Sequence, residues 1–482
     1  MTLSENEFKR LGYQAVDIAA AYLGQLAAGP VFRRMTDGER DVVMNMPIPV
    51  NPISGDQILQ TLTRQILAHP MGNGHPRFFG WVNSPPALMA VITEILAAVM
   101  NPSCAGGDHA AIYLEHCVLR WLKELLGFPL QGSAGLLVSG GSEASLTALT
   151  AARHRALGEL GIDVRKQGVL NIETRLRLYG STQVHTCVQK AVELLGLGSE
   201  CVRWIETDEE FRIRVDQLRR AIREDRESGW HPFCVVGNAG SVQTGAIDPL
   251  NDLADVASEF GLWLHLDGAY GAVAVLDPTS KPFFRGMERA DSIGLDPHKW
   301  LSVPVECGCV LVRDGALLRN AFSLVPAYLR TESGKGIGNM PWFSEYGFQQ
   351  TRGFRALKLW VTLAHAGTFG LQQQIARQIA LARYMEKRIE GIAELELRSK
   401  GKLSIVCFRC VPQELAGNEE AIDALNKRVM EQVQAEGVAF LTNTVLNGRF
   451  ALRACILHYG TTEEDIDLTL DTIRTTAQQL SN

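Results

Sequence analysis

The sequence lacks an excess of positive charge and has no long apolar run. Its formal net charge is −6, which gives no electrostatic footprint for nucleic acid, and it has no block of lysine and arginine that would dock on anionic lipid. The longest apolar stretch, residues 85–100, contains Thr93 and Glu94 and is too short and too polar to span a membrane. Charged residues stand near the N-terminus where a signal peptide needs an apolar core. We therefore expect a soluble, cytoplasmic protein.

Cysteine is also scarce, with ten in 482 residues, which does not indicate a disulfide scaffold. Cys407 and Cys410 form a CxxC, and Cys307 and Cys309 a CxC, but neither has a second Cys/His pair at zinc-finger spacing. The CxxC falls in a strand-like run, where residues i and i+3 point to opposite faces. We predict buried structural thiols and no metal site.

Residues 1–85 read as helices joined by irregular segments. Apolar residues recur three or four positions apart over 7–26 and again over 57–69, which predicts two helices with one apolar face each. A proline-rich extended segment at 44–53 separates them. Two helices so far apart can hardly form a core by themselves, so we expect this segment to pack on a second subunit.

Residues 86–365 alternate between strands and helices. Strands are expected at 135–138, 168–172, 233–236, 262–266, 292–295 and 308–312. Helical stretches such as 144–157 and 186–195 separate several of them, which predicts an α/β domain with a mostly parallel sheet and helices on both faces. Residues 366–482 read as a smaller α+β lobe. In such sheets ligands bind at the carboxyl ends of the strands.

One of these strand ends presents a lysine. The apolar run 292–295 leads into a proline-broken turn that carries His298 and Lys299. A lysine in a turn is usually a solvated surface charge, but this one is followed by the apolar Trp300 and Leu301. A lysine partly removed from water can have a lowered pKa and act as a nucleophile. This stretch alone leaves a Schiff-base lysine and a structural lysine both open.

Three further strand ends carry candidate ligand groups. Two glycines, the second of them Gly141, lead into a helix that opens with Ser142 and whose unpaired N–H groups suit a phosphate, although a plain helix cap fits at least as well. Asp267 could cap a neighbouring helix, or keep a pyridinium nitrogen protonated. Ala269 is small enough for a flat ring to lie against, and His185 is either structural or the aromatic cover of such a ring.

In chain order these parts are a phosphate cradle, an aromatic cover, a carboxylate, a small platform and an amine, which together are what is needed to hold pyridoxal 5′-phosphate (PLP). The runs Ser139-Gly-Gly-Ser-Glu-Ala144, His265-Leu-Asp-Gly-Ala-Tyr270 and Asp296-Pro-His-Lys-Trp300 resemble the group II PLP-dependent amino-acid decarboxylases. This is the family of aromatic-L-amino-acid, histidine and glutamate decarboxylases. The resemblance covers most of the chain, with further matches at 75–79, 353–360 and 452–453.

The resemblance implies a fold-type I homodimer with active sites at the subunit interface, built from an N-terminal helical segment (1–85), a large PLP-binding domain (86–365) and a small C-terminal domain (366–482). It implies that Lys299 forms the Schiff base, that Asp267 pairs with the ring nitrogen, and that His185 and Ala269 lie on the two ring faces. The residues it implies around the phosphate and elsewhere on the cofactor are Gly141, Ser142, His298 and Asn238. Asp296 stands where animal members often carry Asn, and a carboxylate is unfavourable beside a phosphate.

The proton donor and the substrate stay open. The family commonly uses a loop tyrosine as the acid, and in the loop 330–346 the candidate is Tyr346, although an ungapped count puts Phe343 at that position. Members with phenylalanine there can form an aldehyde and consume oxygen. Phe79 and Trp81 resemble an aromatic pocket wall and favour an aromatic substrate. The smaller, more polar run 100–108 keeps glutamate or a diamino acid open.

Other reaction classes are compatible with the same scaffold. A PLP aminotransferase or aldehyde synthase would use the same cofactor residues. A catalytically silent relative is disfavoured because Lys299, Asp267 and His185 are all intact.

Overall fold

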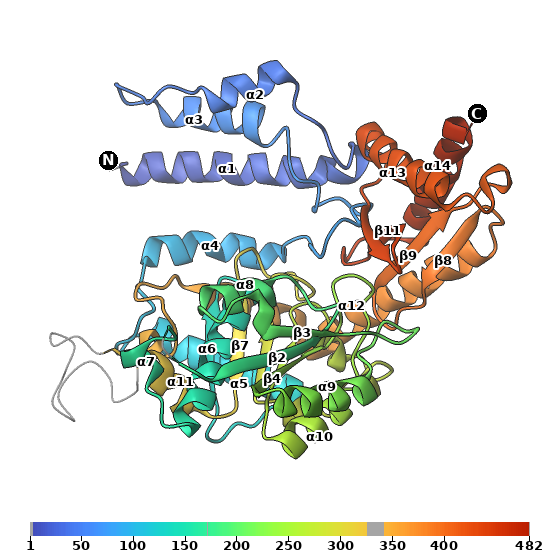
Figure 1. The fold of residues 1–482 in the computed structure, drawn as a ribbon. Helices are drawn as coiled ribbons and strands as arrows, with labels where there is room; N and C mark the ends of the chain where they lie inside the picture. Colours follow the sequence, from blue (N-terminus) through green and yellow to red (C-terminus); the bar gives the residue numbers. More distant parts are fainter. Residues whose placement is uncertain (1–2, 171, 325–341, 482) are drawn as a thin grey trace. The chain divides into compact units, whose positions relative to one another are not determined.

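The computed structural model describes residues 3–170, 172–324 and 342–481 (Figure 1). The chain forms two compact units. The large unit consists of residues 82–380 and 400–405, and the small unit of residues 1–81, 381–399 and 406–482. Helix α12 (Arg355–Glu390) begins in the large unit and ends in the small one.

A seven-stranded sheet in the order β1-β7-β6-β5-β4-β2-β3 forms the centre of the large unit. Strands β2 to β6 pair in parallel, and β7 runs antiparallel to both of its neighbours. The expected mostly parallel sheet is therefore confirmed. The strands are β1 Ala134–Val138, β2 Arg175–Ser181, β3 Val202–Ile205, β4 Trp230–Asn238, β5 Trp263–Asp267, β6 Ser292–Leu295 and β7 Gly308–Val312.

Helices flank this sheet (Figure 1), and α6, α9 and α10 each pack against its strands. The strands β6 and β7 are buried along their whole length, as their continuous apolar sequence indicates for a sheet covered on both faces. The helices of the large unit are α4 Leu88–Met100, α5 Ala110–Leu126, α6 Gly141–Glu159, α7 Val164–Gln167, α8 Cys187–Leu194, α9 Val215–Glu227, α10 Leu250–Phe260 and α11 Gly315–Phe322.

The strand expected at 168–172 is wrong. Gly168 has a φ of +68° and follows directly on the helix α7, and a left-handed backbone at this point cannot continue into a strand. The strand of this region is β2, which begins only at Arg175. Strand β3 has no counterpart among the expected strands, because its four residues include a charged and an exposed side chain and give no apolar pattern.

The small unit contains a four-stranded sheet in the order β10-β11-β9-β8. Its strands are β8 Leu395–Ser399, β9 Ile405–Cys410, β10 Thr442–Leu446 and β11 Arg449–Cys455, and its helices are α1 Glu5–Gln25, α2 Asp37–Met44, α3 Gly55–Thr61, α13 Glu419–Glu436 and α14 Glu463–Ser481. Helices α1, α2 and α3 contain no buried residue. No helix in the described part of the chain is long and apolar enough to cross a membrane.

The cysteines lie where the sequence predicts them. Cys407 and Cys410 are both buried in β9, and all ten cysteines of the chain are free thiols. Among the described residues no group of three His, Cys, Asp or Glu side chains could hold a metal ion.

A buried ion pair ties three parts of the large unit together. The side chains of Arg352 and Glu115 are each 1% exposed and form a salt bridge. Glu115 accepts a hydrogen bond from the backbone N–H of Leu137 in β1, and Arg352 donates to the carbonyl oxygens of Leu137 and Cys104. Each charge is thus compensated by the other and by strand or loop backbone, which a buried ion requires.

We predict that Arg352→Met destabilises the fold by about 3–5 kcal/mol, because it leaves the carboxylate of Glu115 buried without a counter-ion. Chemical denaturation followed by circular dichroism measures the loss. Arg120→Met is the matched control, since Arg120 lies on the same helix as Glu115 but pairs with Glu124 on the surface, and a surface pair contributes less than about 1 kcal/mol. Equal losses in the two variants would contradict this role for the buried pair.

Candidate active site

A cavity of about 340 Å³ lies at the carboxyl ends of the parallel strands of the large unit. This is the edge at which ligands bind in such sheets. The structure brings together here most of the residues singled out in the sequence, from four separate segments of the chain: Gly141, Ser142, His185, Asp267, Ala269, His298 and Lys299.

The first segment is the loop between β1 and α6. Its backbone lies directly against β7, since a Cβ on Gly308 would come 2.4 Å from the Cα of Gly140. A Cβ on Gly141 would come 3.1 Å from the Cβ of Ala269. Helix α6 therefore opens with its backbone N–H groups at the cavity wall, and the N-terminus of a helix attracts an anion such as a phosphate. The carboxylate of Glu143 in the first turn is held by the N–H and Oγ of Ser139, at 2.8 and 2.7 Å.

The second segment places His185 just before α8. Its Nδ1 accepts a hydrogen bond from the N–H of Cys187 at 3.2 Å. Loss of surrounding water lowers the pKa of the imidazole, and this outweighs the opposing charge of Asp267. His185 thus lines the cavity as a neutral ring whose Nδ1 is already engaged.

The third segment follows β5. Asp267 is the last residue of that strand, and its Oδ1 accepts a hydrogen bond from the N–H of Ala269 at 3.1 Å. This turn fixes the carboxylate at the cavity wall and keeps the small side chain of Ala269 on the same wall.

The fourth segment is the turn that carries the lysine. Lys299 Nζ lies 2.9 Å from Asp296 Oδ2, and the Asp296 side chain is only 3% exposed. Burial alone would lower the pKa of the Lys299 ammonium, but the charge and hydrogen bond of Asp296 outweigh it, so that this pKa is raised. A lowered pKa of Lys299 is thus not what the structure has, because Asp296, three residues earlier in the chain, supplies a buried counter-ion.

His298 completes the same turn. Its Nδ1 accepts a hydrogen bond from the N–H of Cys307 at 3.1 Å, and its Nε2 lies 3.8 Å from Asp296 Oδ2. Burial lowers the pKa of His298, against the opposing charge of Asp296. The imidazole is therefore neutral near neutral pH and available as a hydrogen-bonding group.

These residues fit PLP. An amine, a carboxylate and a helix N-terminus converge on one cavity, and the backbone at Gly140 and Gly141 approaches so closely that a Cβ at Gly141 would press on the cavity wall. One feature disfavours the binding of an anion in this cavity. The Oδ1 atom of Asp296 is buried and has no hydrogen-bond partner within the described residues. The ammonium of Lys299 offsets this negative charge.

Four other candidate residues do not line this cavity in the described chain. The side-chain amide of Asn238, at the end of β4, is bonded to Asp248 and to Ser181. Phe79 has no exposed surface and belongs to the core of the small unit, whereas the Trp81 side chain is 48% exposed. Tyr346 lies beside Arg319 and Glu345.

The loop proposed to carry the acid lies mostly outside the described residues. Of the range 330–346, only residues 342–346 are described. Phe343 is buried, with its ring centroid 4.5 Å from that of His116. Glu345 holds this short segment in place by accepting hydrogen bonds from Arg319 and Ser323 of the large unit.

Several residues that line the cavity have no recognisable signal in the sequence. Cys187 lies at the cavity beside His185, and its thiol is kept protonated because burial raises its pKa to about 12. Tyr270 lines the cavity and stacks on Trp300 with ring centroids 4.9 Å apart. Asp296 stands three residues before Lys299 in a turn, which is a signal that the two side chains could meet. The sequence alone cannot show that such a pair, separated by a proline turn, forms an ion pair.

Comparisons with known proteins agree with this site. Residues 40–411 match the family model described as the pyridoxal-dependent decarboxylase conserved domain. An aromatic-L-amino-acid decarboxylase of Bacillus atrophaeus is 35% identical, over 100% of this chain and 98% of that protein. A phenylacetaldehyde synthase of Petunia hybrida is 28% identical, over 100% and 96%. The crystal structure of Oryza sativa TDC with PLP and tryptamine superposes with a TM-score of 0.93 at 27% identity, covering 100% of both chains.

The chain therefore belongs to the pyridoxal-dependent decarboxylase family. It has the fold-type I architecture of that family, and it is a carboxy-lyase that uses PLP as its cofactor. The expected fold class, enzyme class and cofactor are confirmed.

We predict that Asp296→Asn lowers the pKa of Lys299, because it removes the anion that outweighs burial. The pH at which PLP attaches to cofactor-free protein at half its maximal rate should then fall by about one unit. The absorbance of the imine, followed after PLP is added at a series of pH values, measures this shift. Glu306→Gln serves as the control, since Glu306 pairs with Arg355 rather than with the lysine. An unchanged midpoint in Asp296→Asn would exclude Asp296 as the group that raises the pKa.

Proposed function

We propose that this protein converts an aromatic L-amino acid into the corresponding amine and CO₂, with PLP bound covalently to Lys299. The observation that carries the assignment of Lys299 is the convergence of its amine, the Asp267 carboxylate and the first turn of α6 on one cavity. The aromatic substrate is supported by the aromatic-L-amino-acid decarboxylase of Bacillus atrophaeus and by the tryptamine bound to the Oryza sativa protein.

Different residues of the cavity bind different parts of the cofactor. The N–H groups of Gly141 and Ser142 and the imidazole of His298 would hold the phosphate. Asp267 supplies a carboxylate that keeps a proton on the ring nitrogen, and a protonated ring accepts the electrons left behind when the substrate carboxylate departs. His185 would cover the ring of the cofactor, and the small side chain of Ala269 would leave room for it. Asn238, at the end of β4, orients the cofactor-binding end of that strand through its hydrogen bond to Asp248.

The substrate carbon that loses CO₂ must then receive a proton from a positioned acid. Tyr346 is the candidate donor, and burial raises the pKa of its hydroxyl, so that the group is protonated near neutral pH. Its hydroxyl has no hydrogen-bond partner among the described residues, which leaves the proton available. Of the two expected pocket-wall residues, Trp81 is 48% exposed and stays a proposed contact for the substrate side chain, whereas Phe79 has no exposed surface and would act only through the residues packed on it.

A second candidate is an aldehyde synthase that consumes oxygen. Two observations favour it: Phe343, which cannot donate a proton, falls at the position of the acid in an ungapped count, and the phenylacetaldehyde synthase of Petunia hybrida covers the whole chain. In that case Tyr346→Phe should change the products little. In the decarboxylase it should slow amine formation strongly.

We predict that purified protein with added PLP releases CO₂ and an equal amount of amine from tryptophan, tyrosine or phenylalanine, without aldehyde or peroxide. Borohydride reduction followed by peptide mapping should place the cofactor on Lys299. In Asp267→Asn, cofactor should still bind but turnover should fall by about a hundredfold or more, because a neutral amide cannot hold the ring proton.

Each part of this prediction can fail separately. A label on another lysine would remove Lys299 from the role. Aldehyde with peroxide would select the second candidate. Release of CO₂ from glutamate or a diamino acid alone would exclude the aromatic substrate.

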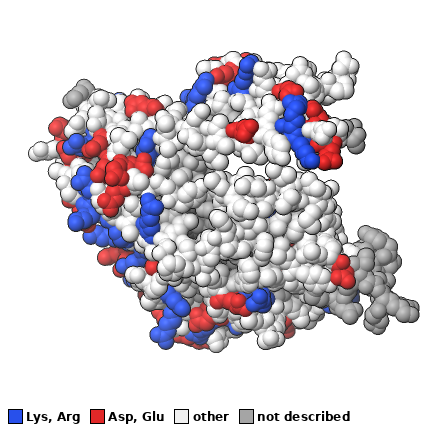
Figure 2. All heavy atoms as spheres, turned by 180° about the vertical axis from the view of Figure 1, so that it is seen from behind, with Lys and Arg blue, Asp and Glu red and all other residues white. Residues whose placement is uncertain are grey.

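We further propose that the protein is a homodimer. Helix α4 buries Ala90 and Thr93, but its other face exposes a row of apolar side chains spaced three and four residues apart: Ile92, Ile95, Leu96 and Val99. Helix α1 buries nothing and exposes Phe8, Tyr13 and Val16. Figure 2 shows a broad area without charged side chains. Apolar surface of this extent usually marks an interface.

We expect the protein to sediment as a dimer at micromolar concentration in analytical ultracentrifugation. The double variant Leu96→Asp/Val99→Asp should shift it to monomer, because two buried carboxylates would have no partner in the interface. Leu468→Asp is the control, since Leu468 is an exposed leucine on α14 outside the proposed surface. A wild-type protein that is monomeric and fully active would refute the proposal.

A further inference from the structure

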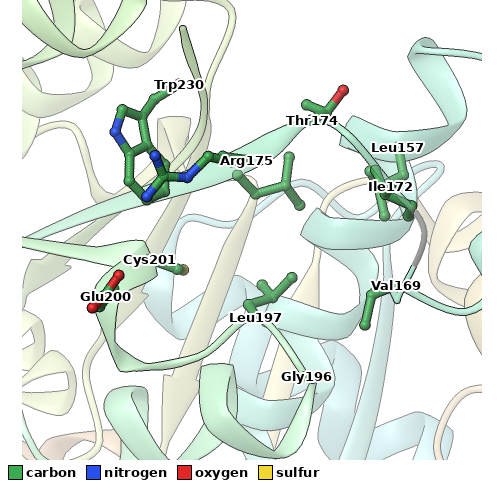
Figure 3. A pocket seen from close by; sticks show the side chains of 11 residues that line it. Leu157, Val169, Ile172, Thr174, Arg175, Gly196, Leu197, Glu200, Cys201 and Trp230 are labelled. Carbon is green, nitrogen blue, oxygen red and sulfur yellow. The ribbon is translucent and has the colours of Figure 1, made fainter. Parts of the chain in front are cut away.

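A second cavity, of about 220 Å³, is shown in Figure 3. It lies where the parallel strands begin, whereas the cofactor cavity lies where they end. Arg175 is the first residue of β2, Trp230 is the first residue of β4, and Cys201 directly precedes β3. These strands are parallel neighbours, so their starts meet at one edge of the sheet. The residues of the cofactor site follow the ends of the strands instead.

One wall of this cavity carries a cation held in place by an indole. The guanidinium of Arg175 lies 3.7 Å from the ring centroid of Trp230. Arg177 contacts the same ring but is also paired with Asp225 at 3.4 Å. The Arg175 side chain makes no ion pair and no hydrogen bond within the described ranges. Stacking on an aromatic ring orients a guanidinium while leaving its N–H groups free to bind an anion.

The same side of the cavity carries an unpaired anion, and the far side is aliphatic. The carboxylate of Glu200 has no cationic partner in the part of the chain that the structure describes. Figure 3 shows Arg175 and Glu200 on one side and Leu157, Val169 and Ile172 on the other. A charge of each sign beside an apolar space is complementary to a zwitterion with an apolar side chain.

We propose that this cavity is a second binding site, for a free aliphatic L-amino acid. Arg175 binds its carboxylate, Glu200 binds its ammonium group, and its side chain lies among the aliphatic residues. The volume corresponds to about seven water molecules at ~30 Å³ each, which suits a branched aliphatic side chain with the charged groups at the open side. Charge-assisted hydrogen bonds provide the orientation.

The position of the site gives such a ligand the role of an effector. Helix α6 begins at Gly141 in the cofactor cavity and brings Leu157 to the second cavity in its last turn. Helix α8 begins beside His185, and Leu197 follows its end. Arg153 on α6 donates to the carbonyl of Leu195 at 2.8 Å, which joins the far ends of the two helices. A ligand between these ends biases the spacing of two helices whose first turns line the cofactor site, and such coupling is reciprocal.

The binding test uses holoenzyme whose cofactor has been fixed by borohydride reduction, so that substrate can no longer displace the lysine. Calorimetric titration with L-leucine should show one site per chain. Arg175→Gln should weaken binding about tenfold or more, and Arg220→Gln should leave it unchanged, since Arg220 is an exposed arginine on α9 outside the cavity. The wild type should bind leucine more tightly than isocaproate, which is leucine without the amine. In Glu200→Gln this difference in affinity should disappear.

The effector role is tested on unreduced enzyme. Leucine should change the decarboxylation rate of the wild type and of Arg220→Gln, but not of Arg175→Gln. No binding at millimolar leucine, or equal binding in Arg175→Gln, overturns the site. An equal effect on the rate in Arg175→Gln, or no effect in the wild type, overturns the effector role. Failure of borohydride to label Lys299 bears on the proposed function and not on this site.

Discussion

The ion pair between Lys299 and Asp296 is the interaction on which the cofactor cavity depends. Both groups lie in a turn with little access to water, and neither charge could stay there alone, because an isolated buried ion loses its hydration without compensation. The ion pair keeps the amine of Lys299 charged and holds it at the wall of the cavity.

The sheet explains why these groups meet. Residues 139–142, 185, 267 and 299 are far apart in the chain, but each lies at or after the carboxyl end of a strand of one sheet. Parallel strands bring their carboxyl ends to a common edge, and the short loops there have few conformations to choose from. The close backbone contact between Gly308 and Gly140 fixes the distance from β7 to the phosphate loop. The catalytic geometry is thus set mainly by backbone packing, and side-chain identity then decides the chemistry.

Local patterns were sufficient for much of this fold. Strands β6 and β7 were predicted with their true bounds, since uniformly apolar runs next to glycine and proline leave little ambiguity. The strand expected at 168–172 failed because its apolar residues belong to a turn after Gly168, and no local signal reveals a left-handed glycine. The cavity residues were found from the chemistry that each strand end offers. The side-chain environments of Asn238 and Asp296 could not be predicted from the sequence, because they depend on Asp248 and Lys299. Only the folded chain defines the positions of these two partners.

Nine of the ten cysteines are buried, and this has a practical meaning for handling the protein. A thiolate is the species that reacts with alkylating agents and oxidants, and burial raises the pKa of thiols such as those of Cys104, Cys201 and Cys407 to about 11. Modification of these groups therefore has to wait for local or global opening of the chain. The rate at which thiol reagents modify these nine cysteines therefore reports on opening of the chain, whereas Cys117, which is only partly buried, reacts in the folded protein.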